Sequence, residues 1–260
     1  MAYENLIITE NSCVKVLTIN RPKALNALNK SVLLELRAAL LDIIHETNGT
    51  KALVITGGGD RSFVAGADIA HMRNLSPLQA ESLSSLGHRV LDLIGRVDIP
   101  VIAAVNGYAL GGGLELALAC DFIYVNKTAV LGLVETSLAL IPGFGGIYRL
   151  ARAVGIPLAK EMIFSASKIS ADEALRIGLV NKVCDGDVLK EAVALSKKIA
   201  KNGPYAISAA KKLLEEGQDM SKNAANAFEK KAFGLTFSTA DSTEGISAFL
   251  EKRYPMYEGK

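Results

Sequence analysis

Two glutamates stand alone in long apolar segments, and their type and placement could support acid and base chemistry. Glu115 is the only charged residue in the range 101–119. Glu135 is likewise the only charged residue in the range 128–148. Burial in such surroundings disfavours the ionised form of a carboxyl group and raises its pKa. The pair could therefore transfer protons near neutral pH; the alternative is that each side chain points outward or pairs with a cation such as Arg149.

Glycines close to these glutamates could supply main-chain groups for the same chemistry. Gly111, Gly112 and Gly113 precede an apolar segment that predicts a helix ending near Cys120. A helix N-terminus presents unpaired N–H groups and the positive end of the helix dipole, which together stabilise a negative oxygen. The segment 62–69, SFVAGADI, is a second candidate because its small side chains let a ligand approach the backbone. Turns and tight helix packing use such glycines about as often.

Other common catalytic groups are scarce or wrongly spaced. His45, His71 and His88 are the only histidines, and no two of them have the spacing of a metal site. The motifs GxSxG, GxxxxGK[ST] and GxGxxG are absent. Carboxylates and main-chain groups must therefore carry any catalysis.

Charge and hydropathy narrow the classes of protein further. The 260 residues include 29 basic and 27 acidic side chains, a net charge of +2, and 50% are hydrophobic. Such a balance gives no support to nucleic-acid binding through phosphates, and the lysine pairs at 197–198, 211–212 and 230–231 are typical of solvated helix faces. The hydrophobic fraction supports a large core, and any surplus would lie in an oligomer interface or an apolar ligand tunnel.

Nothing in the sequence marks the chain for export or for a membrane. No unbroken apolar segment reaches the length of about 18 residues that a membrane span needs. The first residues lack the basic start and apolar core of a signal peptide. The three cysteines are odd in number and far apart, which favours a reducing compartment. We therefore expect a cytoplasmic protein without a membrane partner.

The elements that must position the glutamates alternate between strand and helix, which predicts an α/β fold. Apolar patterning predicts strands at residues 6–9, 14–20, 52–56 and 100–105, with the first two paired as a hairpin. It predicts helices at 31–46, capped by Ser31, and at 76–96. After Val183 the pattern is almost purely helical, with helices at 187–201, 204–216, 219–239 and 242–253. We place a soft boundary near residues 190–200, which divides the chain into a catalytic core, 1–195, and a helical region, 196–260.

Five segments, in order and spacing, resemble the enoyl-CoA hydratase (crotonase) family over nearly the whole chain. They are residues 19–28, INRPKALNAL; 62–69, SFVAGADI; 103–117, AAVNGYALGGGLELA; 141–146, IPGFGG; and 171–180, ADEALRIGLV. Within the family the likeness is greatest to bacterial short-chain 3-hydroxybutyryl-CoA dehydratases. The resemblance implies a crotonase (ClpP-like) spiral of repeated ββα units with a C-terminal helical trimerisation region, assembled as a homotrimer or a homohexamer.

The resemblance also implies roles for individual residues. Glu115 and Glu135 match the two catalytic glutamates of the family. Ala67 and Gly112 match the residues whose backbone N–H groups form the oxyanion hole for the thioester oxygen. Further residues match positions that bind the CoA substrate: Lys23, Ala24, Ala65, Gly66, Asp68 and Ile69 from the same subunit, and Phe233, Phe249 and Lys252 lent by a neighbouring subunit.

The activity implied is that of a hydro-lyase of fatty-acid β-oxidation, which reversibly adds water across the C2=C3 bond of a 2-enoyl-CoA. Glu115 would hold and deprotonate the water, and Glu135 would protonate C2. The two N–H donors would stabilise the enolate oxygen of the intermediate. This chemistry requires no metal and no redox cofactor.

Two departures from the family pattern leave acyl-chain preference and the orientation of Glu135 open. Leu133–Val134 stands where Gln-Pro usually precedes the second glutamate, and Ile147–Tyr148 replaces Thr-Gln. Leu133 is either a core substitution or an adaptation of the acyl pocket. Family isomerases generally use one glutamate at the second position, so Glu115 favours a hydratase over an isomerase, and other acyl-CoA reactions rank lower. A catalytically silent scaffold or RNA-binding protein on this fold is the alternative of a different class.

Overall fold

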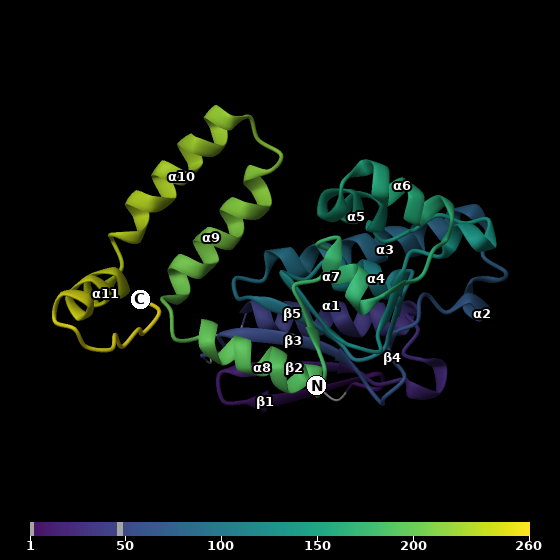
Figure 1. Ribbon diagram of the computed structural model, residues 1–260, viewed down its shortest axis with the longest axis horizontal. Helices are drawn as coiled ribbons and strands as arrows, with labels where there is room; N and C mark the ends of the chain where they lie inside the picture. Colours follow the sequence, from purple (N-terminus) through teal and green to yellow (C-terminus); the bar gives the residue numbers. More distant parts are fainter. Residues whose placement is uncertain (1–2, 46–48) are drawn as a thin grey trace.

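Two β-sheets form the centre of the computed structural model, which describes residues 3–45 and 49–260 (Figure 1). The larger sheet has the strand order β1 (Leu6–Asn11), β2 (Val14–Ile19), β3 (Ala52–Gly57), β5 (Val101–Val105), β7 (Phe122–Asn126), β10 (Lys182–Cys184). The smaller sheet has the order β4 (Ser62–Val64), β6 (Tyr108–Leu110), β8 (Val130–Gly132), β9 (Ile169–Ser170). The predicted hairpin is confirmed, because β1 pairs antiparallel with β2, whereas β2 and the strands after it in the larger sheet are parallel.

The chain repeats one pattern, a strand in each sheet followed by helix. The bounds of the helices in these repeats are α2 (Ile69–Met72) and α3 (Pro77–Arg96) after β3 and β4, α4 (Gly112–Leu118) after β5 and β6, and α5 (Gly146–Val154) and α6 (Ile156–Phe164) after β7 and β8. Because β4, β6 and β8 are parallel neighbours, each repeat places its second strand beside that of the previous repeat. This arrangement is the predicted spiral of ββα units.

Alternate residues of the larger sheet face two different helical layers, as the twofold repeat of a strand requires. Leu53 and Ile55 of β3 belong to the apolar cluster that includes α1 (Lys30–His45) and α3. Val54, between them, belongs to a second cluster that includes α8 (Val188–Ile199). Both faces of the parallel strands are therefore buried, which explains their continuous apolar sequences.

The start of α1 differs from its prediction, because Asn29 and not Ser31 caps it. The Oδ1 atom of Asn29 accepts a hydrogen bond of 2.9 Å from the amide of Val32. Ser31 lies inside the helix, and its Oγ accepts a bond of 3.2 Å from the side-chain amide of Asn5. Asn and Ser are equally good caps, so two candidates two residues apart could not be separated by type alone. The predicted end of this helix, Glu46, lies outside the described residues.

Three helices at the C-terminal end extend away from the sheets, namely α9 (Pro204–Gly217), α10 (Lys222–Thr236) and α11 (Ala240–Leu250) (Figure 1). Together with α8 they are the four helices predicted after Val183, with ends shifted by no more than three residues. The boundary between residues 195 and 196 and the role of this region in trimerisation stay predictions.

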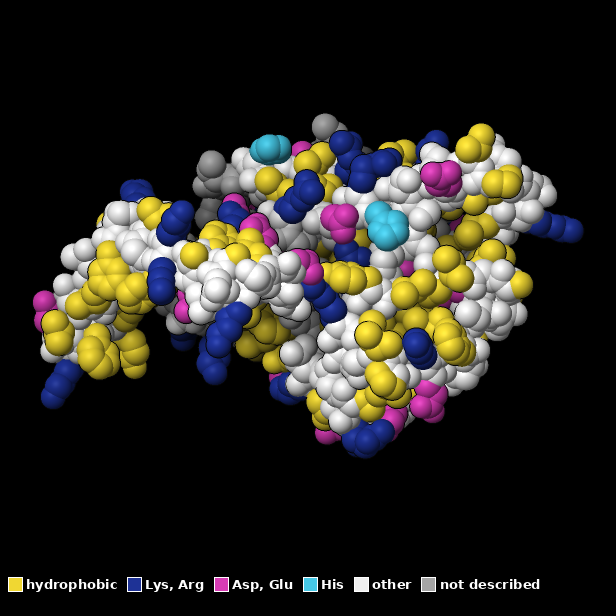
Figure 2. Space-filling model, turned by 90° about the horizontal axis from the view of Figure 1, so that it is seen from above, with side chains coloured by type: hydrophobic (Ala, Val, Ile, Leu, Met, Phe, Trp, Pro, Cys, Tyr) yellow, Lys and Arg dark blue, Asp and Glu magenta, His cyan; other side chains and the backbone are white. Residues whose placement is uncertain are grey.

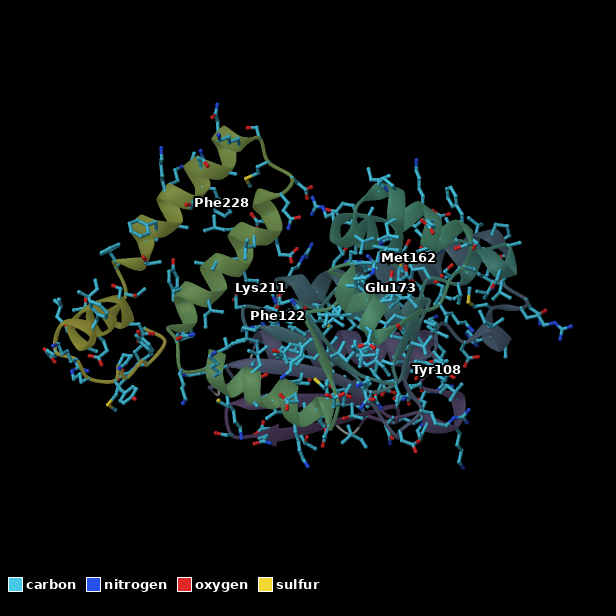
Figure 3. All side chains as sticks on the ribbon, in the orientation of Figure 1. Tyr108, Phe122, Met162, Glu173, Lys211 and Phe228 are labelled. Atoms are coloured by element: carbon cyan, nitrogen blue, oxygen red, sulfur yellow. The ribbon has the colours of Figure 1, made fainter. Side chains whose placement is uncertain are left out.

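Lys211 of α9 points toward the core and connects this helix to it (Figure 3). The prediction of a solvated helix face for residues 211–212 is wrong for Lys211, because its ammonium group is buried and lies 2.9 Å from Oδ2 of Asp121. It also donates to the carbonyl oxygens of Ile94 at 3.2 Å and Ile99 at 3.1 Å. A buried ammonium group with three acceptors is well satisfied, so this contact holds the base of α9 in one place.

Candidate active site

Glu115 lies on the first turn of α4, buried at 1% exposure. Its Oε1 accepts hydrogen bonds from the backbone amides of Phe144, at 2.7 Å, and Gly146, at 2.8 Å. Burial raises the pKa of Glu115, while these two hydrogen bonds act in the opposite direction. The alternative for Glu115 is wrong on both counts, because its side chain is buried and Arg149 pairs instead with Asp92 at 2.7 Å.

Glu135 begins the short 3-10 helix η2 (Glu135–Leu138) and is half-buried. A Cβ atom added to Gly111 would lie 2.8 Å from its Oε1, so the carboxyl group rests against that glycine. Its Oε2 is buried and has no hydrogen-bond partner among the described residues. Burial raises the pKa of Glu135 to about 7, and the negative charge of Glu115 acts in the same direction.

The two glutamates converge on one short piece of backbone. Glu135 touches Gly111, and the amide of Glu115 donates to the carbonyl oxygen of Gly111 at 3.0 Å. Gly111 has a φ of +49°, which favours glycine, and its lack of a side chain leaves room for the carboxyl group. The structure therefore brings Glu115, Glu135 and Gly112 together, as a joint role in acid and base chemistry would require.

The amides of Ala67 and Gly112 are both left outside the regular hydrogen bonding of their elements. Ala67 forms a parallel bridge with Leu28 in which the bonds are made by the Leu28 amide to Gly66 and by the Asp68 amide to Leu28. The Ala67 amide therefore points away from Leu28. Gly112 is the first residue of α4, whose amide has no acceptor within the helix.

Close packing places the segments that carry these two amides side by side. A Cβ atom on Gly113 would overlap the carbonyl group of Val64, so the start of α4 lies directly against β4. A Cβ atom on Gly66 would lie 3.5 Å from the carbonyl oxygen of Leu110. The segments that carry Ala67 and Gly112 are therefore adjacent, which an oxyanion hole made of two N–H donors needs.

The residues predicted to bind CoA from the same subunit lie around two connected loops. Lys23 and Ala24 are exposed in the short 3-10 helix η1 (Pro22–Ala24), and Ile69 is exposed at the start of α2. Ala65 joins the loops, since its amide donates to the carbonyl oxygen of Leu25 at 3.1 Å. These residues form one rim beside the Ala67 amide.

Asp68 has contacts within the protein that account for its position. Its carboxylate caps α2 by accepting from the amide of His71, and it lies 3.3 Å from the guanidinium group of Arg21. Arg21 also donates to the carbonyl oxygen of Ala27 at 2.6 Å. Asp68 therefore holds the two loops together, and Gly66 beside it is buried and provides backbone alone.

The residues predicted to come from a neighbouring subunit lie far from Glu115 in the same chain. Phe233 is on α10 and Phe249 is on α11, with exposed fractions of 66% and 82%, and Lys252 follows α11. These helices occupy the end of the molecule opposite α2 (Figure 1), and hydrophobic side chains gather there on the surface (Figure 2). One chain does not bring these residues to its own glutamates, and their contribution to a second subunit stays a prediction.

The two departures from the family pattern lie in different surroundings. Leu133 is completely buried in the main core, so the structure favours a core substitution over an adaptation of the acyl pocket. Tyr148 is exposed on α5, where its hydroxyl group donates to Asp219 at 3.4 Å. The guanidinium carbon of Arg152 lies 4.4 Å from the centre of the tyrosine ring. Tyr148 therefore belongs to a contact between α5 and the end of α9.

The amides of Phe144 and Gly146 are site groups that the sequence reasoning missed. They lie at the start of α5 just as Gly111 and Gly112 lie at the start of α4, so the same argument about unpaired N–H groups at a helix N-terminus applies to both. The glycines at 143, 145 and 146 were the available signal. Among residues 3–45 and 49–260, no three His, Cys, Asp or Glu side chains are grouped to hold a metal ion. The same part of the chain contains no helix with the length and apolar character of a membrane span.

The fold and the paired glutamates together define a protein of the crotonase class. The crystal structure of an enoyl-CoA hydratase from Bacillus anthracis superimposes with a TM-score of 0.95 and 39% identity, covering 99% of this chain and 100% of that one. The sequence model described as Enoyl-CoA hydratase/isomerase matches residues 9–260, and the chain belongs to that family.

Similar proteins of the family include two bacterial hydratases that match over almost their whole lengths. The crotonyl-CoA hydratase of Syntrophomonas wolfei is 48% identical over 261 residues, covering 100% of both chains. The short-chain-enoyl-CoA hydratase of Clostridium acetobutylicum is 43% identical over 254 residues, covering 97% of both. The resemblance found in the sequence is confirmed.

Proposed function

We propose that this protein catalyses the reversible hydration of short-chain 2-enoyl-CoA thioesters to 3-hydroxyacyl-CoA. The observation that carries the proposal is that two carboxyl groups with raised pKa values lie at the start of α4, Glu115 on its first turn and Glu135 against Gly111. Hydration needs one group to accept a proton from water and another to donate a proton to carbon. The similarity to the hydratases of S. wolfei and C. acetobutylicum supports a short acyl chain.

The proposed reaction uses Glu115 ionised and Glu135 protonated. The water oxygen bonds to C3 while Glu115 takes one of its protons, and the electrons of the C2=C3 bond move toward the thioester oxygen. The amides of Ala67 and Gly112 stabilise that enolate oxygen, an interaction worth about 10²- to 10³-fold in rate per donor. Glu135 then gives its proton to C2 and the carbonyl re-forms. The product gains one hydroxyl group and one hydrogen, and the carboxyl groups return to their starting state by proton exchange.

The acyl-CoA would bind along the rim of Lys23, Ala24, Ala65 and Ile69, with the thioester at the Ala67 amide. We further propose a homotrimer or homohexamer in which Phe233, Phe249 and Lys252 complete the site of a neighbour. The exposure of the two phenylalanines supports this assembly, because large apolar surfaces of soluble proteins usually mark interfaces. The reaction needs only water, two carboxyl groups and two amides, so we propose that it requires no metal and no cofactor.

The test is the loss of enoyl-thioester absorbance when the pure protein meets crotonyl-CoA in buffer containing a chelator. We expect turnover without additions and formation of 3-hydroxybutyryl-CoA. A series of longer 2-enoyl-CoA substrates should show falling kcat/KM with chain length. The proposal fails if crotonyl-CoA is not consumed, or if the protein only moves the double bond of a 3-enoyl-CoA.

A further inference from the structure

The ring of Phe144 fills a space between two helices that exists because both helices carry glycine there. On one side it lies against Gly87 of α3, where an added Cβ atom would overlap the ring. On the other side Cδ2 and Cε2 of the ring lie 3.4 Å from the position of a Cβ atom on Gly112 of α4. Phe144 is 5% exposed, so the ring is enclosed on both sides.

The backbone around this ring is the segment that holds Glu115. The amides of Phe144 and Gly146 donate to Oε1 of Glu115. Two further contacts hold the same segment. The hydroxyl group of Ser84 on α3 donates to the carbonyl oxygen of Gly143 at 2.6 Å, and Arg149 donates to that of Phe144 at 3.0 Å. The buried ring thus fixes a short loop, and the amides of that loop orient the carboxylate of Glu115.

We propose that Phe144 is a positioning residue for hydration: its ring, seated against Gly87, fixes the two amides that orient Glu115 and also supports the Gly112 end of the oxyanion hole. The inference rests on the proposed function. It assigns to α3, which carries neither glutamate, a part in the geometry of Glu115 and of the oxyanion hole. Gly87 and Phe144 act as one unit, because the ring occupies the volume that a side chain at residue 87 would take.

A misplaced ring would impair catalysis more than substrate binding. Displacement of a catalytic group by about 1 Å can reduce the rate by about 100-fold, because the reacting atoms no longer align. The CoA rim at Lys23 and Ala65 is on other loops and would be unaffected. Weaker amide hydrogen bonds would also raise the pKa of Glu115, because these bonds favour its ionised form.

Two glycines of α3 provide a matched pair of variants. In Gly87→Ala the new methyl group meets the Phe144 ring, and we expect kcat for crotonyl-CoA to fall by about 10- to 100-fold with KM changed less than about twofold. In Gly95→Ala the new methyl group meets no described atom within 4 Å other than its chain neighbours and the adjacent backbone of α3. That variant should keep wild-type kcat. Equal activity of the two variants would overturn the proposal.

Phe144→Leu tests the same contact between Phe144 and Gly87 without adding volume. It can be measured even if Gly87→Ala does not fold. We expect the same loss of kcat. The acid limb of the kcat profile should also move to higher pH in both variants, since hydration uses ionised Glu115. Phe122→Leu, a half-buried site on β7, is the control for a general loss of packing and should leave the limb in place. A fall in kcat with an unmoved acid limb would show a merely structural role and contradict the proposal.

A titration that does not depend on turnover separates this inference from the proposed function. With carboxyl-¹³C glutamate in the protein and Glu115→Gln to assign the signal, the pKa of Glu115 can be followed by NMR. We expect a higher pKa in Gly87→Ala and Phe144→Leu than in the wild type and in Gly95→Ala. An unchanged pKa in both variants overturns the positioning role, whereas absence of crotonyl-CoA turnover in the wild type overturns the proposed function.

Discussion

Glu115 and Glu135 both have raised pKa values, but their surroundings prepare them for opposite roles. Glu115 accepts hydrogen bonds from two backbone amides, which favour its ionised form, as a base requires. The Oε2 atom of Glu135 is buried and receives no hydrogen bond from any described group. This environment favours the neutral form of the carboxyl group, as an acid requires. Pairs of carboxyl groups whose environments separate their protonation states are a common basis of acid and base catalysis.

The residue scale predicts a pH dependence for hydration. Because Glu135 must be protonated and its pKa is about 7, kcat/KM should fall as the pH rises through about 7. Crotonyl-pantetheine is the substrate for this measurement, since it lacks the nucleotide phosphates of CoA, which titrate nearby. Dehydration of the hydroxyacyl thioester uses the same single proton on the other glutamate, so its kcat/KM should fall over the same range. A hydration rate that stays constant from pH 6 to pH 9 would contradict the assigned role.

The same pKa shift predicts an effect of Glu135 on stability. Between its ordinary pKa of 4.5 and about 7 the folded protein binds the proton more tightly than the unfolded chain, so stability falls as the pH rises. Glu135→Gln removes the buried charge and should raise the free energy of unfolding by about 1–2 kcal/mol at pH 8. At pH 5 the gain should nearly vanish. Urea unfolding at one protein concentration measures both values, and a gain of equal size at both pH values would refute the cause.

The sequence revealed the two glutamates because each is the single charge in a long apolar segment. The same reasoning left open whether Glu115 pairs with Arg149, because a partner 34 residues away is decided by tertiary structure. In the structure Arg149 forms an ion pair with Asp92, and Glu115 accepts hydrogen bonds from two backbone amides. Almost every residue has a backbone amide, so the identity of residue 144 did not indicate that its amide binds Glu115.

At the scale of elements, glycines set how closely α4 approaches its neighbours. Gly113 lies against the carbonyl group of Val64 and Gly112 lies against the Phe144 ring. The start of α4 is therefore enclosed between β4 and the loop before α5. The sequence predicted this helix, the alternating strands and the C-terminal helices, because their apolar patterns are strong and local. The contacts between these elements depend on the shapes of their packed surfaces, which a hydropathy pattern does not predict.

The cap of α1 offers a prediction about an element. Asn29→Ala removes the side-chain acceptor of the Val32 amide and should lower the free energy of unfolding by about 1 kcal/mol. Ser31→Ala, inside the same helix, is the matched control and should cost less than half as much. Thermal or urea unfolding of the two variants checks the difference. If Ser31→Ala proved the more harmful, the cap would be the one predicted from the sequence.

At the scale of the molecule, α10 and α11 place large apolar side chains on the surface far from the glutamates of the same chain (Figure 2). The resemblance to the family suggested that such residues serve a neighbouring site. The sequence predicted these helices because their apolar patterns are local, whereas an interface is formed with a second copy of the chain.

The assembly predicts an effect of Phe249 on substrate binding. If a neighbour uses this exposed ring to bind CoA, Phe249→Ala should raise KM for crotonyl-CoA by about tenfold and leave kcat nearly unchanged. Light scattering should find a trimer or hexamer for both proteins. Phe164→Ala on α6, also exposed, is the control at 75% exposure. An unchanged KM for Phe249→Ala in an intact oligomer would remove this residue from the site.

The most direct test of the whole account is to compare kcat for crotonyl-CoA hydration in Glu115→Gln, Glu135→Gln and the double variant. Two groups that act on one water and one substrate work as a unit, so each single variant should lose about 10²- to 10⁴-fold. The double variant should be no more than about tenfold slower than the worse single one. Glu191→Gln on α8, across the sheet, should retain full activity. The account is contradicted if either single variant keeps more than about a tenth of the wild-type kcat, or if the two losses simply multiply.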